Sequence, residues 1–354
     1  RVVTEAVPPL RRCVGWRDGV QAGCRKLGVA MQEVETNVVV PVEVVSDKEE
    51  TAARTIRPKV HRQLSKYVVD LPAVELVEKR KAWPKGAAPA NRWDLKAASL
   101  PGIDRTAKGV SKHYKGGYVA AKKLLDEFLK RKLSRYAEHR NEPSSNCASH
   151  MSPYLRFGHI SALEVALAVK RHSGGSKPGK ESFLEELIVR RELAFNMCHY
   201  NPKYDKLYSI IPSYAAQTLR QHASDKREYC YSYAQLAAAE THCPYWNAAQ
   251  REMIATGKMQ GYMRMYWCKK ILEWVARPED AFNYAVRLNN VYNLDGNDPN
   301  SYAGVAWCFG KHDQGWKERP IFGKVRYMNA AGLQRKFNMA AYLEQVDRLH
   351  PTGA

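Results

Sequence analysis

The residues of this sequence best suited to chemistry are tryptophans in its second half. Trp267 and Trp274 lie seven positions apart, about two helical turns, so they share one face of an expected helix, with Met265 on an adjoining part of it. Indole rings can pass single electrons, because their radical cations are accessible. Such a stripe is more often ordinary core, and the spacing alone favours that interpretation.

A second group that could act on a ligand is the segment SHMSPY at residues 149–154. Ser149 and Ser152, with the backbone near Met151, could hydrogen-bond phosphate groups at a helix N-terminus, where Pro153 suits the first turn. A plain N-cap by Ser152 would have the same sequence. The signatures GxGxxG, GxxxxGK[ST], HExxH and GxSxG do not occur, which lowers the support for dinucleotide dehydrogenases and hydrolases.

The charge balance of the 354 residues favours a polyanionic partner. Lys and Arg number 56 against 36 Asp and Glu, a formal charge of +20, which suits nucleic acid or an acidic membrane face. A solvated basic surface is the alternative. The richest apolar run, residues 38–45, is interrupted by Pro41 and Glu43 and is too short for a membrane span, so we expect a soluble protein.

The eight cysteines are scattered without CxxC pairs, which is typical of reduced thiols in an intracellular protein. We expect the protein in the nucleus if its source is eukaryotic and in the cytoplasm otherwise. His242 beside Cys243 lacks two further ligands at suitable spacing, so we expect packing there and no metal site. The chain starts at Arg1, inside an amphipathic pattern, and we expect an incomplete N-terminus.

Periodicity divides the chain into an α/β part and a helical part. The first 66 residues show an expected helix, strand and charged helix, at residues 10–28, 34–45 and 46–60. This pattern suits a nucleotide-binding type of layered α/β domain, but 66 residues are too few to form a complete one. Residues 67–110 are rich in Pro, Lys and Ala and indicate a linker. From residue 111 onward the apolar spacing is helical.

Several long segments resemble class II cyclobutane pyrimidine dimer photolyases of the photolyase/cryptochrome family. In chain order they are RNEPSSNCASHMSPYLRFGHISA, FLEELIVRREL, THCPYWNAAQREMIATGKMQGYMRMYWCKKILEW, LNNVYNLDGNDPNSYAGVAW and WKERPIFGKVRYM. The resemblance implies a light-driven deoxyribodipyrimidine photo-lyase, a carbon–carbon lyase that repairs DNA with FAD. It implies a partial, Rossmann-like antenna domain at 1–66, a linker at 67–110 and an all-α FAD-binding, catalytic domain at 111–354.

The same resemblance assigns cofactor contacts. It places the FAD pyrophosphate at Tyr136, Ser149, Met151 and Ser152. Arg264 and Asp295 match the ion pair beside the isoalloxazine ring, where a guanidinium favours negative charge on the flavin. Asn289 matches the amide facing flavin N5, and Arg191 a flavin-contacting arginine. The alternatives are a turn-capping role for Asn289 and an exposed helical salt bridge for Arg191.

The lesion must leave the duplex to reach a buried flavin, and base flipping achieves this. By resemblance, Trp307 stacks on the flipped dimer, Met265 packs beside it, and Glu186 hydrogen-bonds its carbonyl edge. Glu185 is adjacent, and a surface ion pair is the ordinary role of such a carboxylate. Candidates for the flanking phosphates are Lys311, Lys317, Arg319, Lys324 and Arg326.

The resemblance also makes Trp246, Trp267 and Trp274 an electron chain to photoexcited oxidised flavin. At three places this sequence differs from the residues usual in the family. Cys243 stands in place of Asp, Gln260 in place of His, and Cys308 with Phe309 in place of a small polar and an aliphatic residue. Of these, Gln260 puts local hydrogen bonding at the pocket in doubt. The shortened α/β part leaves the antenna chromophore open. We expect a monomer whose partner is ultraviolet-damaged DNA, with no membrane.

Two other functions are considered. A cryptochrome-like photoreceptor would bind the same cofactor and signal without repairing DNA. An inactive remnant would bind DNA but neither signal nor repair it. Trp307, Met265 and Glu186 favour repair, because a receptor has no need of a dimer-stacking tryptophan.

Overall fold

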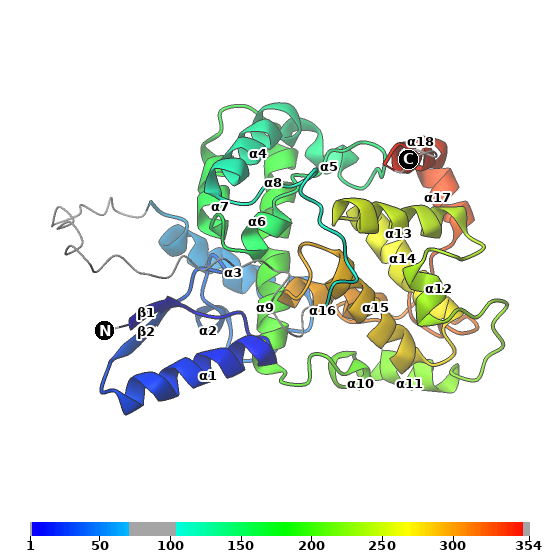
Figure 1. The fold of residues 1–354 in the computed structure, drawn as a ribbon, viewed down its shortest axis with the longest axis horizontal. Helices are drawn as coiled ribbons and strands as arrows, with labels where there is room; N and C mark the ends of the chain where they lie inside the picture. Colours follow the sequence, from blue (N-terminus) through cyan, green and yellow to red (C-terminus); the bar gives the residue numbers. More distant parts are fainter. Residues whose placement is uncertain (1, 71–103, 350–354) are drawn as a thin grey trace.

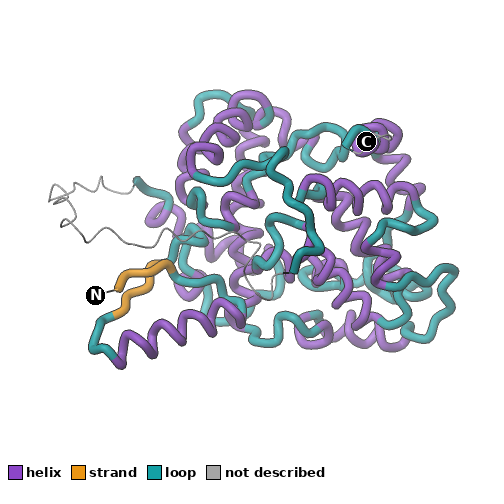
Figure 2. The backbone as a smooth tube through the Cα atoms, viewed as in Figure 1, coloured by secondary structure: helices purple, strands orange, loops and turns teal. Residues whose placement is uncertain are grey.

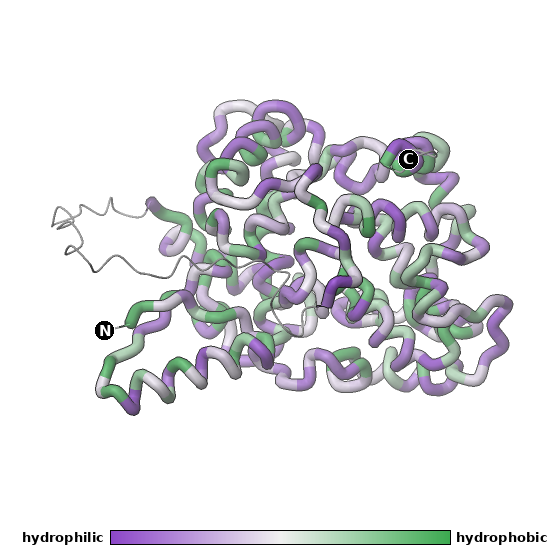
Figure 3. The backbone as a smooth tube through the Cα atoms, in the orientation of Figure 1, coloured by the Kyte–Doolittle hydropathy of each residue, from purple (hydrophilic) through white to green (hydrophobic). Residues whose placement is uncertain are grey.

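A computed structural model describes residues 2–70 and 104–349. The chain begins with a parallel strand pair, β1 (Val2–Glu5) and β2 (Met31–Val34), with Val2 opposite Met31. The helix α1 (Arg11–Lys26) connects them, as parallel strands require a crossover. Figure 3 shows hydrophilic and hydrophobic residues interspersed along α1. The helix predicted at residues 10–28 is confirmed as α1, whereas strand β1 is not among the predicted elements. The assignment of this part to a Rossmann-like antenna domain stays a prediction.

The strand predicted at residues 34–45 is wrong. Strand β2 ends at Val34, and Val42–Val45 form a helical turn, α2. Pro41, with φ of −53°, is the residue before that turn, and its missing N–H cannot join a ladder. The amides of Val39 and Val40 donate to the Glu192 carboxylate instead of to a strand. The apolar run is therefore buried as irregular chain.

Helix α3 (Ala53–Tyr67) follows, beginning seven residues later than the helix predicted from Ser46. Ser46 and Glu50 are buried in the turn before it, where Ser46 Oγ donates to Glu50 Oε1 at 2.6 Å. Most of the predicted linker at 67–110 lies outside the described residues.

From residue 118 onward the described chain is helical, as predicted, and Figure 2 shows strands only near the N-terminus. The first group of helices is α4 (Tyr118–Arg131), α5 (Tyr136–His139), α6 (Ser152–Arg156), α7 (Ala162–Arg171), α8 (Lys177–Leu184) and α9 (Arg191–Tyr200), with a 3-10 turn at Leu133–Arg135 and a π-helical turn at Glu185–Arg190.

The second group begins with three short helices, α10 (Leu207–Ile210), α11 (Ser213–Gln221) and α12 (Tyr233–Ala237). It continues with α13 (Pro244–Thr256), α14 (Gly261–Trp274), α15 (Pro278–Tyr292), α16 (Pro299–Cys308), α17 (Ala330–Lys336) and α18 (Met339–Asp347). Proline opens α13, α15 and α16, where its lack of an N–H costs no helical hydrogen bond. Gly257, with φ of +72°, ends α13.

Two apolar cores hold this body together. One joins buried residues between 39 and 68 to helices α4–α9, and the other joins Leu10 to residues between 197 and 346. In Figure 1, α9 runs between the two groups of helices. The domain boundaries at 66 and 110 stay predictions.

Candidate functional site

A cavity of about 490 Å³ opens between the two groups of helices. Its walls come from residues 136–152, the π-helical turn with Arg191, residues 252–265 and residues 295–301. The structure brings nine of the predicted site residues to this cavity: Tyr136, Ser149, Met151, Ser152, Glu186, Arg191, Arg264, Met265 and Asp295. Asn289, Trp246, Trp267, Trp274 and Trp307 do not line it.

The cavity wall carries a cluster of two cations on one carboxylate. Arg264 Nη2 lies 3.1 Å from Asp295 Oδ1, and Lys258 Nζ lies 2.6 Å from Asp295 Oδ2. Burial would raise the pKa of Asp295, but Arg264 and Lys258 outweigh it and hold that pKa well below its usual range. The cluster therefore carries one net positive charge, which suits an anionic ligand. Sequence reasoning missed Lys258, since nothing in its neighbours marks it.

One donor of this cluster is left for a ligand. Arg264 Nε is buried and has no hydrogen-bond partner in the described part of the chain. Because a buried guanidinium N–H without an acceptor is costly, the orphaned donor favours an acceptor supplied from the cavity.

The two serines of SHMSPY differ in role. Ser152 Oγ donates to Asp295 Oδ2 at 2.6 Å and accepts from Lys258, so its side chain belongs to the charged cluster. It is the first residue of α6 and caps no amide, which makes the plain N-cap interpretation wrong. Ser149 Oγ accepts from the amide of Met151 at 3.3 Å.

The backbone beside these serines is unusual. Asn146 and His150 line the cavity with φ of 46° and 56°, in the left-handed region that residues other than glycine seldom adopt. His150 is held by Asn146 Oδ1 at 2.8 Å and by the Tyr114 hydroxyl at 3.1 Å. Such backbone strain often accompanies ligand sites.

On the opposite wall the structure separates Glu186 from Glu185. Glu186 lines the cavity and accepts from Arg140 Nη1 at 2.7 Å. Glu185 instead forms ion pairs with Arg57 and Arg190, at 2.8 and 3.1 Å. The carboxylate chosen from the sequence is thus the one that faces the cavity.

Arg191 is buried at 7% exposure, so the alternative of an exposed helical salt bridge is wrong. Its Nε donates to the Asn37 carbonyl at 3.0 Å. Tyr136 is also buried in the wall, and burial raises its pKa to about 12.

Gln260 is the N-cap of α14. Its Oε1 accepts from the amides of Tyr262 and Met263, and its Nε2 donates to the Arg140 carbonyl at 2.8 Å. The amide therefore joins the two walls of the cavity, and the hydrogen bonding put in doubt by this departure is satisfied.

Asn289 lies just behind the charged cluster. Its Oδ1 accepts from Asn293 Nδ2 at 2.9 Å, and Asn293 Oδ1 in turn accepts from Arg264 Nη2 at 3.1 Å. Asn289 reaches the cavity only through this relay, and its role toward flavin N5 stays a prediction.

Three buried tryptophans form a row. The rings of Trp267 and Trp246 stack at 6.2 Å between centroids, and Trp246 meets Trp274 edge to face at 5.8 Å. Along α14, Trp267 follows the cavity-lining Met265 by two residues and Trp274 follows it by nine, so Trp267 is the member of the row nearer to the cavity along this helix. Sequence spacing placed Trp267 and Trp274 on one face of a helix, but it did not reveal that Trp246 of α13 lies between them.

The outer end of the row contacts a surface cluster that sequence reasoning missed. Trp274 lies 5.5 Å from Tyr231 and 5.0 Å from His242, between centroids. The Tyr231 hydroxyl lies 2.7 Å from His242 Nδ1, and Tyr229 stacks on His242 at 3.7 Å. The His242 side chain thus packs among aromatic rings, as expected from the sequence.

Trp307 lies at the end of α16 with cations near its ring. Lys269 Nζ and the Arg326 guanidinium carbon lie 5.5 and 5.6 Å from its centroid. Arg326 also lies 4.8 Å from the ring of Trp316, which is 41% exposed. Arg326 therefore lies between the rings of Trp307 and Trp316, while Lys269 approaches Trp307 from the buried side.

The cations predicted to grip phosphates differ in exposure. Lys317, Arg319 and Lys324 are exposed, whereas Lys311 is buried and its ammonium pairs with Glu49. Lys311 is therefore not available to a phosphate, a correction to the sequence-based set.

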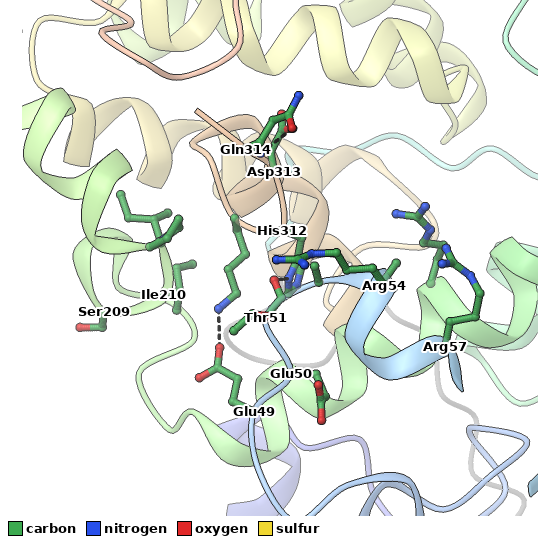
Figure 4. A pocket seen from close by; sticks show the side chains of 16 residues that line it. Glu49, Glu50, Thr51, Arg54, Arg57, Ser209, Ile210, His312, Asp313 and Gln314 are labelled. Atoms are coloured by element: carbon green, nitrogen blue, oxygen red, sulfur yellow. Dashed lines mark hydrogen bonds and ion pairs between the residues drawn. The ribbon is translucent and has the colours of Figure 1, made fainter. Parts of the chain in front are cut away.

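A second cavity of about 780 Å³ lies between α3 and residues 311–314 (Figure 4). Its wall carries both signs of charge, and most of them are paired, as Lys311 with Glu49 and Arg57 with Glu185. We assign it no ligand.

No family model matches the chain. Among curated proteins, it is 46% identical over 330 residues to a deoxyribodipyrimidine photo-lyase of Methanothermobacter thermautotrophicus, covering 93% of this chain and 71% of that protein. Proteins of the same name from Oryza sativa and Potorous tridactylus are 45% and 41% identical, over 91% and 98% of this chain and 64% of each relative. The chain thus spans about two thirds of their length.

Solved structures with low identity show the fold. A class III photolyase from Agrobacterium tumefaciens gives a TM-score of 0.74 at 19% identity, covering 98% of this chain and 68% of that one. A Synechocystis cryptochrome gives 0.66 at 14%, covering 98% and 71%. The fold is therefore that of photolyases and cryptochromes, and the curated relatives decide between the two: the chain belongs to the deoxyribodipyrimidine photo-lyase family.

Proposed function

We propose that this chain repairs cyclobutane pyrimidine dimers in ultraviolet-damaged DNA by light-driven electron transfer from FAD, as a class II enzyme. The observation that carries the proposal is the row of three tryptophan rings whose member Trp267 follows the cavity-lining Met265 by two residues on α14. An electron path of this kind serves a cavity that holds a redox cofactor.

The cavity residues fit FAD. Arg264 and Lys258 give its wall a net positive charge, and the free Nε of Arg264 offers a donor to an acceptor atom of the flavin. Ser149 and the strained segment at Asn146–Met151 would hold the pyrophosphate. When bound, reduced FAD supplies the electron that opens the cyclobutane ring.

The lesion side of the cavity is proposed at Met265 and Glu186, with Trp307 as the stacking ring. Arg140 Nη1 donates to the Glu186 carboxylate at 2.7 Å and so holds it in the wall of the cavity. As a carboxylate, Glu186 would accept from a pyrimidine N–H, and as a carboxylic acid it would donate its proton to the carbonyl edge. Met265 supplies an apolar wall that keeps water from the dimer.

The DNA surface is proposed around Trp307 and Trp316, with Arg326 between them. Exposed Lys317, Arg319 and Lys324 lie on the same segment and would neutralise phosphates flanking the lesion.

Trp267, Trp246 and Trp274 are proposed to conduct an electron from the surface toward the cavity, and Trp274 is the outer member. Contact with Tyr231 and His242 joins this outer ring to polar side chains at the surface.

A cryptochrome-like photoreceptor is the second candidate, and the fold similarity to the Synechocystis cryptochrome is its support. Glu186 at the cavity and Trp307 among cations favour repair instead. A monomer, the nuclear or cytoplasmic location and the antenna chromophore stay open predictions. Within the two described ranges, no helix combines the length and apolar character needed to cross a bilayer.

The test is a plasmid assay. The purified chain, loaded with FAD, is mixed with ultraviolet-irradiated plasmid and kept under blue light or in the dark before transformation. We expect recovery of transformants only under light. Stoichiometric FAD with no recovery would support the photoreceptor, and protein that cannot be loaded with FAD would contradict both functions.

A further inference from the structure

Lys269 of α14 is fully buried, at 0% exposure, although lysine is among the residues least often buried without a partner. In the part of the chain that the structure describes, it forms no ion pair with a carboxylate. Its ammonium instead donates to the carbonyl oxygen of Cys308 at 2.5 Å. A buried charge without a counter-ion costs free energy, so its retention calls for a reason.

The contacts of Lys269 connect two helices of the proposed site. Cys308 is the last residue of α16, and carbonyls at a helix C-terminus carry partial negative charge that a cation stabilises. The same ammonium lies 5.5 Å from the centroid of Trp307, within the range of a cation–π contact. Met265, one helical turn before Lys269 on the same face of α14, lines the cavity. Lys269 thus joins the helix of the cavity to the helix that carries Trp307.

We propose that Lys269 is a positioning residue for lesion binding, whose buried ammonium holds Trp307 and the end of α16 in register with the cavity. This inference rests on the proposed function, because it takes Trp307 as the ring that stacks on the dimer. Lys269 itself touches neither the lesion nor the cofactor.

The charge state of Lys269 makes the inference testable by pH. Burial lowers its pKa to about 8. The groups facing it are Cys268 on its own helix, Cys308 on α16, Asp313 and Arg326; the first three favour the ammonium and Arg326 opposes it. The contact with Trp307 should therefore weaken as pH rises through about 8.

The first experiment replaces the charge but keeps an unbranched apolar chain, as Lys269→Met. Binding to a dimer-containing duplex and to the undamaged duplex is measured alongside FAD content and thermal unfolding. We expect FAD content unchanged, unfolding at an equal or higher temperature, and an affinity for damaged DNA about tenfold lower, while affinity for undamaged DNA is kept. If Lys269 were only structural, Lys269→Met would lower the unfolding temperature without a selective loss of affinity for damaged DNA.

Lys177→Met is the matched control, because Lys177 lies at the start of α8 with 87% of its side chain exposed and does not line the cavity. It removes the same formal charge and should leave the ratio of damaged to undamaged affinity unchanged. Trp307→Ala separates the role of Lys269 from the proposed lesion site on which it rests. If Trp307→Ala loses selectivity and Lys269→Met keeps it, the role of Lys269 is wrong. If the parent shows no selectivity that Trp307→Ala can remove, the proposed lesion site itself is wrong.

The second experiment measures the pH dependence of the parent protein, so it does not depend on the stability of a variant. The affinity ratio of the parent is measured from pH 7 to pH 9, where we expect a fall centred near pH 8, and the ratio of Lys269→Met should stay flat. A parent ratio that does not change over this range, or an equal fall in Lys269→Met, would overturn the inference. Should Lys269→Met fail to fold, the parent profile alone decides.

Discussion

The indole of Trp246 lies nearly parallel to that of Trp267, with 10° between the ring planes, and Trp246 Nε1 donates to the Trp267 carbonyl at 2.9 Å. Trp267 Nε1 in turn donates to the buried Gln250 Oε1 at 2.9 Å. Both rings are therefore held by stacking and by a hydrogen bond, and neither can rotate without leaving a buried polar atom unpaired. This rigidity suits an electron path between α13 and α14.

Trp267→Phe should separate photoreduction from repair. Phenylalanine keeps an aromatic ring in the core but leaves Gln250 Oε1 without its donor, a cost of about 1–3 kcal/mol in stability. We expect the absorbance of oxidised flavin to persist under blue light, while the chemically reduced protein still repairs dimers without oxygen. Trp16→Phe, at an exposed ring on α1, is the control. Photoreduction at the parent rate would mean that the row is only core.

Trp307→Ala should weaken binding of dimer-containing DNA by about 1–3 kcal/mol, the usual contribution of base stacking on an aromatic ring. FAD content should not change, because Trp307 does not line the cavity. Titration of labelled duplexes at fixed salt measures the effect, with Trp16→Ala as the matched loss of an exposed tryptophan. Equal affinity of Trp307→Ala and parent for the damaged duplex would make Trp307 structural.

Asp295→Asn should destabilise the protein and empty the cavity of cofactor, because Arg264 and Lys258 lose their shared carboxylate. Removing one partner of a buried ion pair costs about 3–5 kcal/mol. The pKa of Asp295 is lower in the folded than in the unfolded chain, so its contribution is complete above about pH 3.8 and is lost as pH falls below that.

Urea unfolding at neutral pH and near pH 3 measures this contribution. Asp347→Asn is the control, since Asp347 pairs with Arg251 on the surface with 63% of its side chain exposed. An Asp295→Asn protein as stable as this control would contradict the charged cluster as described.

Glu252→Gln should change how stability depends on pH. Burial raises the pKa of Glu252 to about 7, although the Tyr342 hydroxyl donates to it at 2.6 Å. Between about pH 4.5 and pH 7 the folded chain holds a proton that the unfolded chain has released, so stability falls as pH rises through this range, by up to about 1.4 kcal/mol per pH unit. Glutamine should flatten that slope in urea unfolding. An unchanged slope would place the carboxyl in contact with water.

The sequence by itself determined the helical second half, the family resemblance and nine of the residues that line the cavity. Helical periodicity reports which side faces the core, and the serines, Arg264, Glu186 and Asp295 belong to long segments whose order is distinctive. The prediction of a strand at residues 34–45 is wrong, because an apolar run interrupted by Pro41 does not reveal whether a neighbouring strand exists to pair with it.

Only the tertiary structure decided how distant segments meet. Lys258 joins Asp295 across 37 positions, Trp246 enters the row from a different helix, and Lys269 reaches the end of α16. These contacts depend on how α13, α14 and α16 pack, and a side chain's spacing along its own helix carries no information about its partner on another. The same reason explains why Lys311, basic in the sequence, is a buried ion-pair partner of Glu49 rather than a cation free for DNA.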